Sequence, residues 1–269
     1  MGGRVLIIAG SDSGGGAGIQ ADLKTVTALG GYAATAVTAL TAQNTRGVFG
    51  VLDIAPDFIA QQISLVLDDI GADCIKTGML HNSAVIETVV SILEDLAPDT
   101  PLVVDPVMVA KGGESLLEPL AQETLSRHLV PRATIITPNV PEAEVLSGVV
   151  IHSPNDMRKA ARHLLALGPE AVLLKGGHLQ GEIVPDLLVF QDREEDFVMP
   201  RLDTKHTHGT GCTLASAIAV GLAQGMALDA AVRRALFYVH EAIRSAPGLG
   251  HGRGPLNHGH TVHPFSGEW

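Results

Sequence analysis

Short apolar runs alternate along the chain with longer segments in which apolar residues recur at helical spacing. The runs are rich in Val, Ile, Leu and Ala and lack polar–apolar alternation, which is typical of parallel strands buried on both faces. They predict strands at Arg4–Gly10, Tyr32–Leu40, Ala72–Gly78, Pro101–Val107, Ala133–Asn139 and Ala171–Gly177. The amphipathic segments predict helices near residues 17–30, 56–70, 82–97, 118–130, 154–168, 209–224 and 228–245.

This alternation of strand and helix predicts an α/β fold with a doubly wound, mostly parallel sheet covered by helices. Two further segments, Asp186–Gln191 and Asp196–Arg201, are expected to form a hairpin near the edge of the sheet. We find no repeat of fixed period and no long Pro/Ser linker in the 269 residues. One domain spanning residues 1–269 is therefore expected.

The net charge limits the classes of partner. A formal charge of −11 argues against non-specific binding to nucleic acid and against docking on anionic membranes. A phosphate ligand remains compatible with this charge, because a few backbone N–H groups can hold an anion inside an acidic protein.

Cysteine usage and the apolar runs bear on the location of the protein. Two cysteines, Cys74 and Cys212, give no disulfide framework and indicate a reducing compartment. The run Val5–Ala9 is too short for a signal peptide, and no stretch approaches the ~20 apolar residues of a membrane span. A cytoplasmic protein is expected.

Polar or glycine residues follow five of the predicted strands at their carboxyl ends. Ligands collect at these ends in open α/β sheets. The segments are Gly10–Gly18, Lys76–Met79, Asp105–Met108, Thr137–Asn139 and Lys175–His178. They predict one large site on one rim of the sheet.

The segment Thr207–Thr213 carries the strongest local signal. It reads Thr-His-Gly-Thr-Gly-Cys-Thr and precedes an apolar helix with Leu214, Ile218 and Leu222 four residues apart. Glycines at a helix start leave N–H groups free, and the helix dipole adds positive potential. Such an end can hold a phosphate or the charge of a phosphoryl group in transit. The alternative is a glycine-rich turn beside a small buried cysteine.

Cys212 lies at the start of that helix. A helix N-terminus lowers the pKa of a thiol, so we expect a lowered pKa and a role as base or nucleophile. A Cys–His hydrolase with His208 as partner is a second interpretation, although neither residue follows an obvious strand-to-helix elbow. Cys74, inside a predicted strand, is expected to be an inert core residue.

Two common nucleotide-binding motifs do not fit the sequence. Gly14–Gly18 contains Gly-x-Gly-x-Gly, but it lacks the Gly-x-Gly-x-x-Gly spacing, and no acidic residue closes a second strand. The sequence also has no Gly-x4-Gly-Lys followed by Ser or Thr, which excludes a P-loop kinase.

Two acidic residues are candidates for holding Mg²⁺. Asp105 and Glu142 are predicted at neighbouring strand ends, where carboxylates can hold the ion through water molecules. The alternative for Glu142 is N-capping, because it follows Pro141, which we place at the first helical position.

The C-terminal segment is rich in glycine and histidine. Gly250–Pro255 is followed by His258, His260 and His263, which suggests a metal-binding tract as one interpretation. We prefer a mobile, glycine-rich lid or a surface tail, because no Cys or carboxylate completes a tight metal site.

Taken together, seven segments resemble the bacterial hydroxymethylpyrimidine/phosphomethylpyrimidine kinase family of the ribokinase-like superfamily. The resemblance covers nearly the whole chain. In family order, the segments are Ala9–Thr25, Thr38–Thr45, Lys76–Leu80, Asp105–Met108, Thr137–Ala143, Lys175–His178 and Thr207–Thr213. The resemblance implies a three-layer α/β/α fold. It also implies ATP-dependent phosphorylation of 4-amino-5-hydroxymethyl-2-methylpyrimidine to the monophosphate and then to the pyrophosphate, in thiamine biosynthesis.

The resemblance further implies roles for individual residues. The anion hole and catalytic group would comprise Gly209, Thr210, Gly211, Cys212 and Lys175. Cys212 would be the base, at the place where most ribokinase-like enzymes have Asp. ATP and its phosphates would be bound by Asn139, Glu142 and Lys175, with Mg²⁺ ordered by Asp105 and Glu142 through water. The pyrimidine would be bound by Gly10, Asp22, Gln43, Met79 and Val107. A homodimer is also expected.

Two other functions remain open. A pyridoxal kinase of the same superfamily is the nearer one. Gln43 argues against it, because a side-chain amide offers a donor and an acceptor to the amino group and ring nitrogen of an aminopyrimidine, whereas pyridoxal presents a phenol oxygen. A non-catalytic pyrimidine sensor on the same fold is the other. An assay of ATP turnover separates it from an enzyme.

Overall fold

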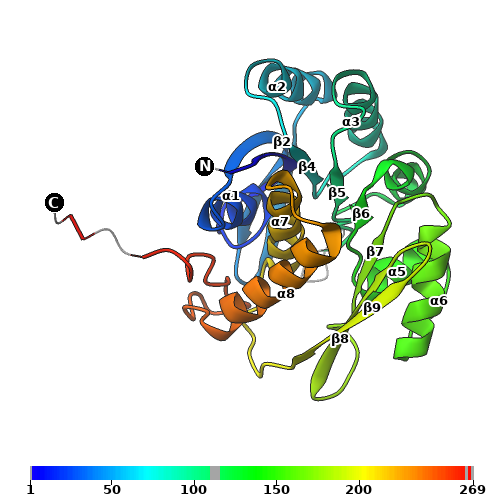
Figure 1. Ribbon diagram of the computed structural model, residues 1–269. Helices are drawn as coiled ribbons and strands as arrows, with labels where there is room; N and C mark the ends of the chain where they lie inside the picture. The colour runs from blue at the N-terminus through cyan, green and yellow to red at the C-terminus, as the bar shows by residue number, and fades with distance from the viewer. Residues whose placement is uncertain (1, 110–115, 264–265, 268–269) are drawn as a thin grey trace.

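The computed structural model describes residues 2–109, 116–263 and 266–267. Within these residues, nine strands form one sheet in the order β3-β2-β1-β4-β5-β6-β7-β8-β9, with helices on both faces (Figure 1). The α/β class, the mostly parallel sheet and the three-layer arrangement are confirmed.

Six neighbouring strands of this sheet run parallel to one another. They are β2 (Tyr32–Asn44), β1 (Arg4–Asp12), β4 (Cys74–Thr77), β5 (Leu102–Val104), β6 (Ile135–Ile136) and β7 (Val172–Lys175). At one edge β3 (Gly47–Asp53) pairs antiparallel with β2. At the other edge lies the expected hairpin of β8 (Ile183–Val189) and β9 (Glu194–Pro200). The parallel direction brings six carboxyl ends to one rim.

The central strand β1 divides the apolar core between the two faces. Val5, Ile7 and Ala9 belong to the cluster under one helical layer, and Leu6 and Ile8 belong to the cluster under the other. The first layer contains α1 (Gly18–Ala28), α7 (Thr210–Ala223) and α8 (Leu228–Arg244). The second contains α2 (Pro56–Asp69), α3 (Ser83–Leu96), α4 (Pro119–Thr124), α5 (Val140–Ser147) and α6 (Pro154–Leu165). A π-helical turn, Leu125–Leu129, and a 3₁₀ turn, Val130–Arg132, follow α4.

The sequence indicated α5 only by its start near Pro141, and it did not indicate β3. The helix α5 has only eight residues, so its periodic signal is short. The strand β3 lies at the sheet edge with most of its side chains exposed, and its pairing lengthens β2 from the expected Leu40 to Asn44. Both elements depend on partners that lie elsewhere in the chain.

The expectation of a surface tail is wrong for part of the C-terminal segment. The backbone N–H of Arg253 donates to the carbonyl of Thr45 at 2.8 Å, and that of His208 donates to the carbonyl of Gly254 at 3.1 Å. The side chain of His258 is buried and its Nε2 lies 3.0 Å from Thr213 Oγ1. The segment therefore packs against the start of α7.

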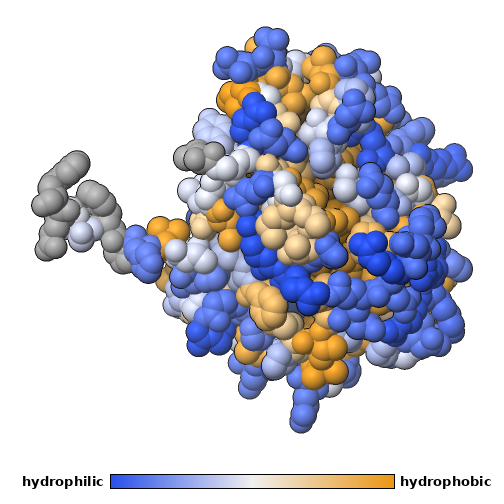
Figure 2. All heavy atoms as spheres, viewed as in Figure 1, coloured by the Kyte–Doolittle hydropathy of each residue, from blue (hydrophilic) through white to orange (hydrophobic). Residues whose placement is uncertain are grey.

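On the face shown in Figure 2, hydrophobic residues lie among hydrophilic ones rather than apart from them. Within the described parts of the chain, no helix has both the length and the apolar character needed to cross a membrane.

Two leucines of α3 test this account of the core. Leu93 is fully buried, and Leu96, three residues later, is 49% exposed. We expect Leu93→Ala to lower the free energy of unfolding by about 2–5 kcal/mol, because it removes buried methyl groups and leaves a cavity. Leu96→Ala should change it by less than about 1 kcal/mol. Urea denaturation of both variants measures the difference, and equal losses would contradict the assigned burial.

Candidate active site

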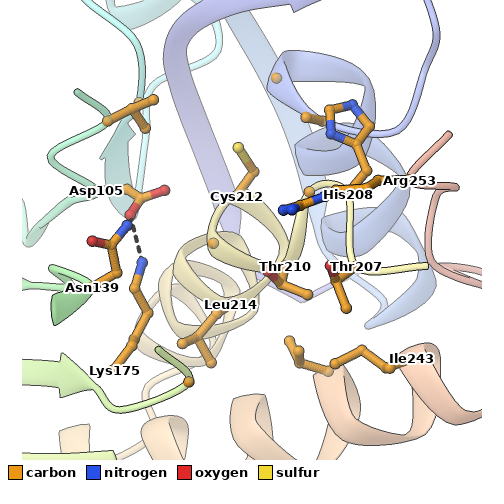
Figure 3. A pocket seen from close by; sticks show the side chains of 18 of the residues that line it. Asp105, Asn139, Lys175, Thr207, His208, Thr210, Cys212, Leu214, Ile243 and Arg253 are labelled. Atoms are coloured by element: carbon orange, nitrogen blue, oxygen red, sulfur yellow. Dashed lines mark hydrogen bonds and ion pairs between the residues drawn. The ribbon is translucent and has the colours of Figure 1, made fainter. Parts of the chain in front are cut away.

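A pocket of about 480 Å³ opens at the carboxyl rim of the parallel strands. Its lining includes almost every residue that the sequence placed in the site: Gly10, Gln43, Met79, Asp105, Val107, Asn139, Glu142, Lys175, Gly209, Thr210, Gly211 and Cys212. The structure thus brings these residues together in one pocket on one rim. Figure 3 shows Cys212 at the start of α7, with Asp105, Asn139 and Lys175 to one side and His208 and Arg253 to the other.

Gly209, the N-cap residue of α7, has a conformation that requires glycine. Its φ is +87°, in the left-handed region, and a Cβ atom here would lie 1.9 Å from the carbonyl oxygen of Gly16. The loop after β1 therefore packs directly on the start of α7. Gly209 has no side chain to cap the helix, so the first N–H groups of α7 provide the positive potential that an anion needs.

Asp105 and Lys175 form an ion pair beside this helix start. Lys175 Nζ lies 3.1 Å from Asp105 Oδ1, which also accepts from the hydroxyl of Thr137 at 3.1 Å. A Cβ atom on Gly211 would lie 3.3 Å from both Asp105 Oδ2 and Lys175 Nζ. Burial alone would lower the pKa of Lys175, but the carboxylates of Asp105 and Glu142 outweigh it and raise that pKa. A permanent cation thus lies at the anion-binding end of α7.

Glu142 caps α5, as the alternative interpretation of the sequence proposed. Its Oε2 accepts from the Asn139 backbone N–H at 2.8 Å, and Asn139 Oδ1 accepts from the Glu142 N–H at 3.0 Å. The helix begins at Val140, so Pro141 is its second residue and not its first. Burial raises the pKa of Glu142, while Lys175 opposes this rise. Capping accounts for the position of Glu142 and leaves its side chain at the pocket wall.

The expectation of a lowered pKa at Cys212 is wrong. Burial raises the pKa of its thiol to about 12, although the nearby Lys76 ammonium opposes the rise. The helix end does not compensate for the loss of water around sulfur. Cys212 is therefore a neutral thiol, and the backbone N–H of Gly18 donates to it. Cys74 is a buried core residue, as expected.

Asp22 lies beneath the pocket and not in its wall, which corrects its assignment to the pyrimidine. Its side chain is fully buried, with Oδ2 2.9 Å from Lys76 Nζ and Oδ1 accepting from the Ser216 hydroxyl at 2.7 Å. Lys76 is itself fully buried and lines the pocket. Asp22 thus holds a buried cation below Cys212 on α7, since Ser216 lies one turn further along the same helix.

His208 contacts the other side of the pocket. Its Nε2 lies 2.8 Å from Asp12 Oδ2 and 3.3 Å from the side-chain nitrogen of Gln43. Because His208 contacts these groups and Cys212 contacts Gly18, the geometry gives no support to the Cys–His hydrolase interpretation.

Three parts of the site had no individual role in the sequence-based prediction. Lys76 was placed at the rim within Lys76–Met79, and it had a further signal, since a lysine in a strand predicted to be buried on both faces needs a partner. Arg253 had no such sequence signal, because only the packing of the C-terminal segment brings it to the pocket (Figure 3). The apolar end of the pocket, formed by Leu214, Leu236 and Ile243, arises from the packing of α7 against α8.

The described residues form no cluster of side chains that could ligate a metal ion by themselves. Among the described residues, no group of three or more His, Cys, Asp and Glu side chains is arranged to hold a metal ion. This includes the histidines of the C-terminal segment up to His263.

Comparison with known proteins identifies close relatives. The chain is 50% identical over 255 residues to the hydroxymethylpyrimidine/phosphomethylpyrimidine kinase of Streptomyces coelicolor, covering 95% of this chain and 94% of that protein. It is 53% identical over 258 residues, 95% of this chain, to the thiamine biosynthesis bifunctional protein ThiED of Geobacter sulfurreducens. The chain spans about half of that longer protein, 52% of its length.

Solved structures give the same result for the fold. The phosphomethylpyrimidine kinase of Clostridium difficile matches with a TM-score of 0.80 and 46% identity, over 89% of this chain and 99% of that one. A pyridoxal kinase of Staphylococcus aureus in complex with pyridoxal matches with a TM-score of 0.89 and 35% identity, over 96% of this chain and 94% of that one.

The family model described as phosphomethylpyrimidine kinase matches residues 12–257, which include the pocket rim, the start of α7 and the packed C-terminal segment. The chain belongs to the phosphomethylpyrimidine kinase family.

Proposed function

We propose that residues 1–269 form a single kinase domain that transfers the γ-phosphate of ATP to 4-amino-5-hydroxymethyl-2-methylpyrimidine and then to the monophosphate, in thiamine biosynthesis. The main support for this proposal is that three features line the same pocket. They are the glycine-rich N-terminus of α7, the Asp105–Lys175 ion pair and the amide of Gln43. Relatives of the same length with 45–50% identity carry the matching name. An assay with ATP and the alcohol that resolves the products by mass tests the proposal.

The first reaction needs both charge stabilisation and removal of a proton. The hydroxyl oxygen of the pyrimidine attacks the γ-phosphorus, the bond to the ADP oxygen breaks, and the hydroxyl proton leaves. The N–H groups at the start of α7 and the ammonium of Lys175 face the place where phosphoryl charge develops. Cys212 is the proposed base: its thiolate, a minor form because burial raises the pKa to about 12, would accept the hydroxyl proton, and the Lys76 ammonium opposes part of that rise.

The second reaction differs in its acceptor. The attacking group is a phosphate oxygen of the monophosphate, which is already anionic and has no essential proton to lose. The same anion hole can serve it, because the need for stabilised phosphoryl charge is unchanged. Cys212 should therefore matter less in this step.

We propose Mg²⁺ as the metal, held through water by Asp105 and Glu142. The oxygens of Glu142 already accept from Asn139 and from the Met108 backbone N–H, yet each carboxylate oxygen has two acceptor positions. Such groups suit a hydrated ion better than direct ligation. When bound, Mg²⁺ would neutralise charge on the ATP phosphates.

Pyridoxal phosphorylation is the second candidate, because pyridoxal kinases of known structure share this fold with TM-scores of 0.87 and 0.89. Sequence identity favours the pyrimidine, at 45–53% for the pyrimidine-kinase relatives and 36% and 35% for those two structures. The proposed pairing of Gln43 with an aminopyrimidine edge points the same way.

We further propose a cytoplasmic homodimer. The free thiols of Cys74 and Cys212 suit a reducing compartment. The edge strand β3 offers unpaired backbone groups together with the exposed side chains of Phe49 and Leu52, at 71% and 63% exposure. An edge of this kind is a ready surface for a second copy.

The role of Cys212 can be separated from packing by comparing the two reactions. We expect Cys212→Ala to lower kcat of the first phosphorylation about 10²–10⁴-fold, the usual contribution of a general base, and to leave the KM of ATP nearly unchanged. The second phosphorylation should lose far less. Cys212→Asp should recover the first. Equal losses in both reactions would make Cys212 a packing residue.

Because the pKa of Cys212 is raised to about 12, its thiolate fraction increases as pH rises. The kcat of the first phosphorylation in the unmodified enzyme should therefore climb between about pH 7 and pH 9. Steady-state rates across this range, measured for each step, check the dependence. A flat profile for the first step would count against the thiolate.

Glu142→Gln tests the metal proposal. The substitution keeps the size and an acceptor oxygen for the cap of α5 but removes the charge. We expect the Mg²⁺ concentration for half-maximal rate to rise about tenfold or more, the scale of a lost hydrogen bond to a charged group. Glu144→Gln, in the same helix but outside the pocket, is the control and should leave this concentration unchanged. Matching titrations for all three proteins would remove Glu142 from the metal site.

Phe49→Glu tests the dimer. Light scattering coupled to size exclusion should give twice the mass of the chain for the unmodified protein. It should give the mass of a single chain for Phe49→Glu, because a charge would be buried at the β3 edge. Phe237→Glu on α8, where Phe237 is 59% exposed, should remain dimeric. A monomeric unmodified protein, or a dimeric Phe49→Glu, would contradict the proposal.

A further inference from the structure

The amide of Gln43 lies between two groups that restrict how it can be oriented. In the structure its oxygen lies 3.1 Å from Thr41 Oγ1 and its nitrogen lies 3.3 Å from His208 Nε2. Each neighbour has a second contact. His208 Nε2 lies 2.8 Å from Asp12 Oδ2, and the Thr41 hydroxyl lies 2.9 Å from the carbonyl of Ser11. These second contacts decide which atoms can donate to the amide and which can accept from it.

Asp12 requires a hydrogen on His208 Nε2. Its Oδ2 already accepts from the backbone N–H groups of Gly16 at 3.0 Å and Ala17 at 2.8 Å, and its Oδ1 accepts from Gly14 at 2.7 Å. Burial would raise the pKa of Asp12, but the hydrogen bonds from His208, Ala17 and Gly14 outweigh it and lower that pKa. An ionised carboxylate only accepts, so the ring nitrogen facing it must donate. This holds for both neutral and protonated imidazole.

A protonated Nε2 has no lone pair and cannot accept from the nitrogen of Gln43. At the other end, Thr41 has one hydroxyl hydrogen, and the carbonyl of Ser11, at 2.9 Å against 3.1 Å for the Gln43 oxygen, is the nearer acceptor for it. The Thr41 oxygen is then available to accept from Gln43 and not to donate to it. The two ends of a side-chain amide are told apart by their hydrogen-bond partners. Both neighbours therefore place the oxygen of Gln43 towards His208, where it shares the Nε2 hydrogen with Asp12, and its nitrogen towards the accepting oxygen of Thr41.

We propose that His208 is a positioning residue that fixes the orientation of the Gln43 amide and thereby sets which ligand edge the pocket accepts. The remaining lone pair of the amide oxygen then lies on the His208 side, and the remaining N–H lies on the Thr41 side. A matching ligand needs a donor next to an acceptor, in that order. The inference rests on the proposed function, because it takes Gln43 to bind the pyrimidine.

An aminopyrimidine meets both requirements at once, with its amino group as donor and the adjacent ring nitrogen as acceptor. Pyridoxal has carbon substituents on both sides of its phenol oxygen, so it can satisfy one of the two positions. A fixed amide therefore discriminates between the two ligands, whereas an amide free to turn over could adapt to either. If the Gln43 amide were free to turn over, the preference for the aminopyrimidine over pyridoxal should fall, and ATP binding should change much less.

The surroundings of His208 keep the ring in place. Asp12 and His208 are 2% and 9% exposed. A Cβ atom on Gly16 would lie 2.5 Å from His208 Cδ2, so the loop after β1 packs closely on the ring. The His208 backbone N–H is bonded to the carbonyl of Gly254. The donor at Nε2 is thus held from three segments of the chain.

Two substitutions at residue 208 separate the donor from simple packing. His208→Leu removes the donor, whereas His208→Gln can place a side-chain N–H near the position of Nε2. We expect His208→Leu to raise the KM of the aminopyrimidine alcohol about tenfold, the scale of one hydrogen bond, and to reduce its preference over pyridoxal by a similar factor. The KM of ATP should change less than about twofold. His208→Gln should recover most of the preference, and Thr41→Val should show the same selective loss.

The tautomer can also be observed without substrate. Nitrogen-15 NMR of the histidine rings, with the His208 signals assigned by their absence in His208→Gln, should show a hydrogen on Nε2. A bare Nε2 with the hydrogen on Nδ1 would overturn the proposal. It would also be overturned if His208→Leu and His208→Gln behaved alike, or if the KM values of ATP and pyrimidine rose together.

Gln43→Ala distinguishes these outcomes from a failure of the proposed function. If it leaves the KM of the pyrimidine unchanged, Gln43 does not bind that substrate and the proposed recognition is wrong, whatever the tautomer of His208. If it raises that KM while the residue-208 variants show no difference, recognition by Gln43 stands and the positioning role of His208 is wrong.

Discussion

The carboxylate of Asp12 holds the loop after β1 against the segment that precedes α7, and the pocket depends on this contact. This carboxylate accepts from three backbone N–H groups of the loop after β1 and from the ring of His208, which lies next to Gly209, the N-cap residue of α7. This arrangement presses the carbonyl of Gly16 against Gly209, where no side chain would fit. The start of α7 is thereby placed opposite the carboxyl ends of the parallel strands. The anion-binding end of a helix and the polar ends of the sheet become one site because of this contact.

The charges of the pocket follow from that placement. An acidic chain of net charge −11 concentrates two lysines, Lys76 and Lys175, beneath and beside the start of α7. Each has a carboxylate partner, Asp22 for Lys76 and Asp105 for Lys175, so neither ammonium is buried alone. An unpaired buried charge would cost several kcal/mol by rough estimate. The pairs make it feasible to keep positive charge near a phosphate without an exposed basic surface.

The parallel strands and most of the pocket lining could be predicted from the sequence, because they depend on local patterns. The parallel strands are continuous apolar runs, and the residues that end them are glycines or polar groups, so both the rim and its lining could be predicted.

Cys212 shows where such reasoning fails. Its position at a helix start was predicted correctly, but its pKa depends on burial by neighbours that are distant in sequence. Asp22 failed for the same reason, since only the fold shows that Lys76 and Ser216 occupy both of its oxygens. Arg253 and β3 likewise depend on long-range packing.

The choice of a thiol at residue 212 makes physical sense in this environment. Asp22 and Asp105 both act to raise the pKa of Cys212, and Glu142 adds a third carboxylate in the same pocket region. A further carboxylate at the start of α7 would bring another negative charge close to the incoming phosphates and to these three groups. Because its pKa is raised, Cys212 is mostly a neutral thiol, and in that form it adds no repulsion while ATP binds. The benefit would be greatest for a substrate that is itself a phosphate, as in the second phosphorylation. A neutral group at this position thus suits an enzyme that must place a phosphorylated acceptor and a nucleotide against the same helix end.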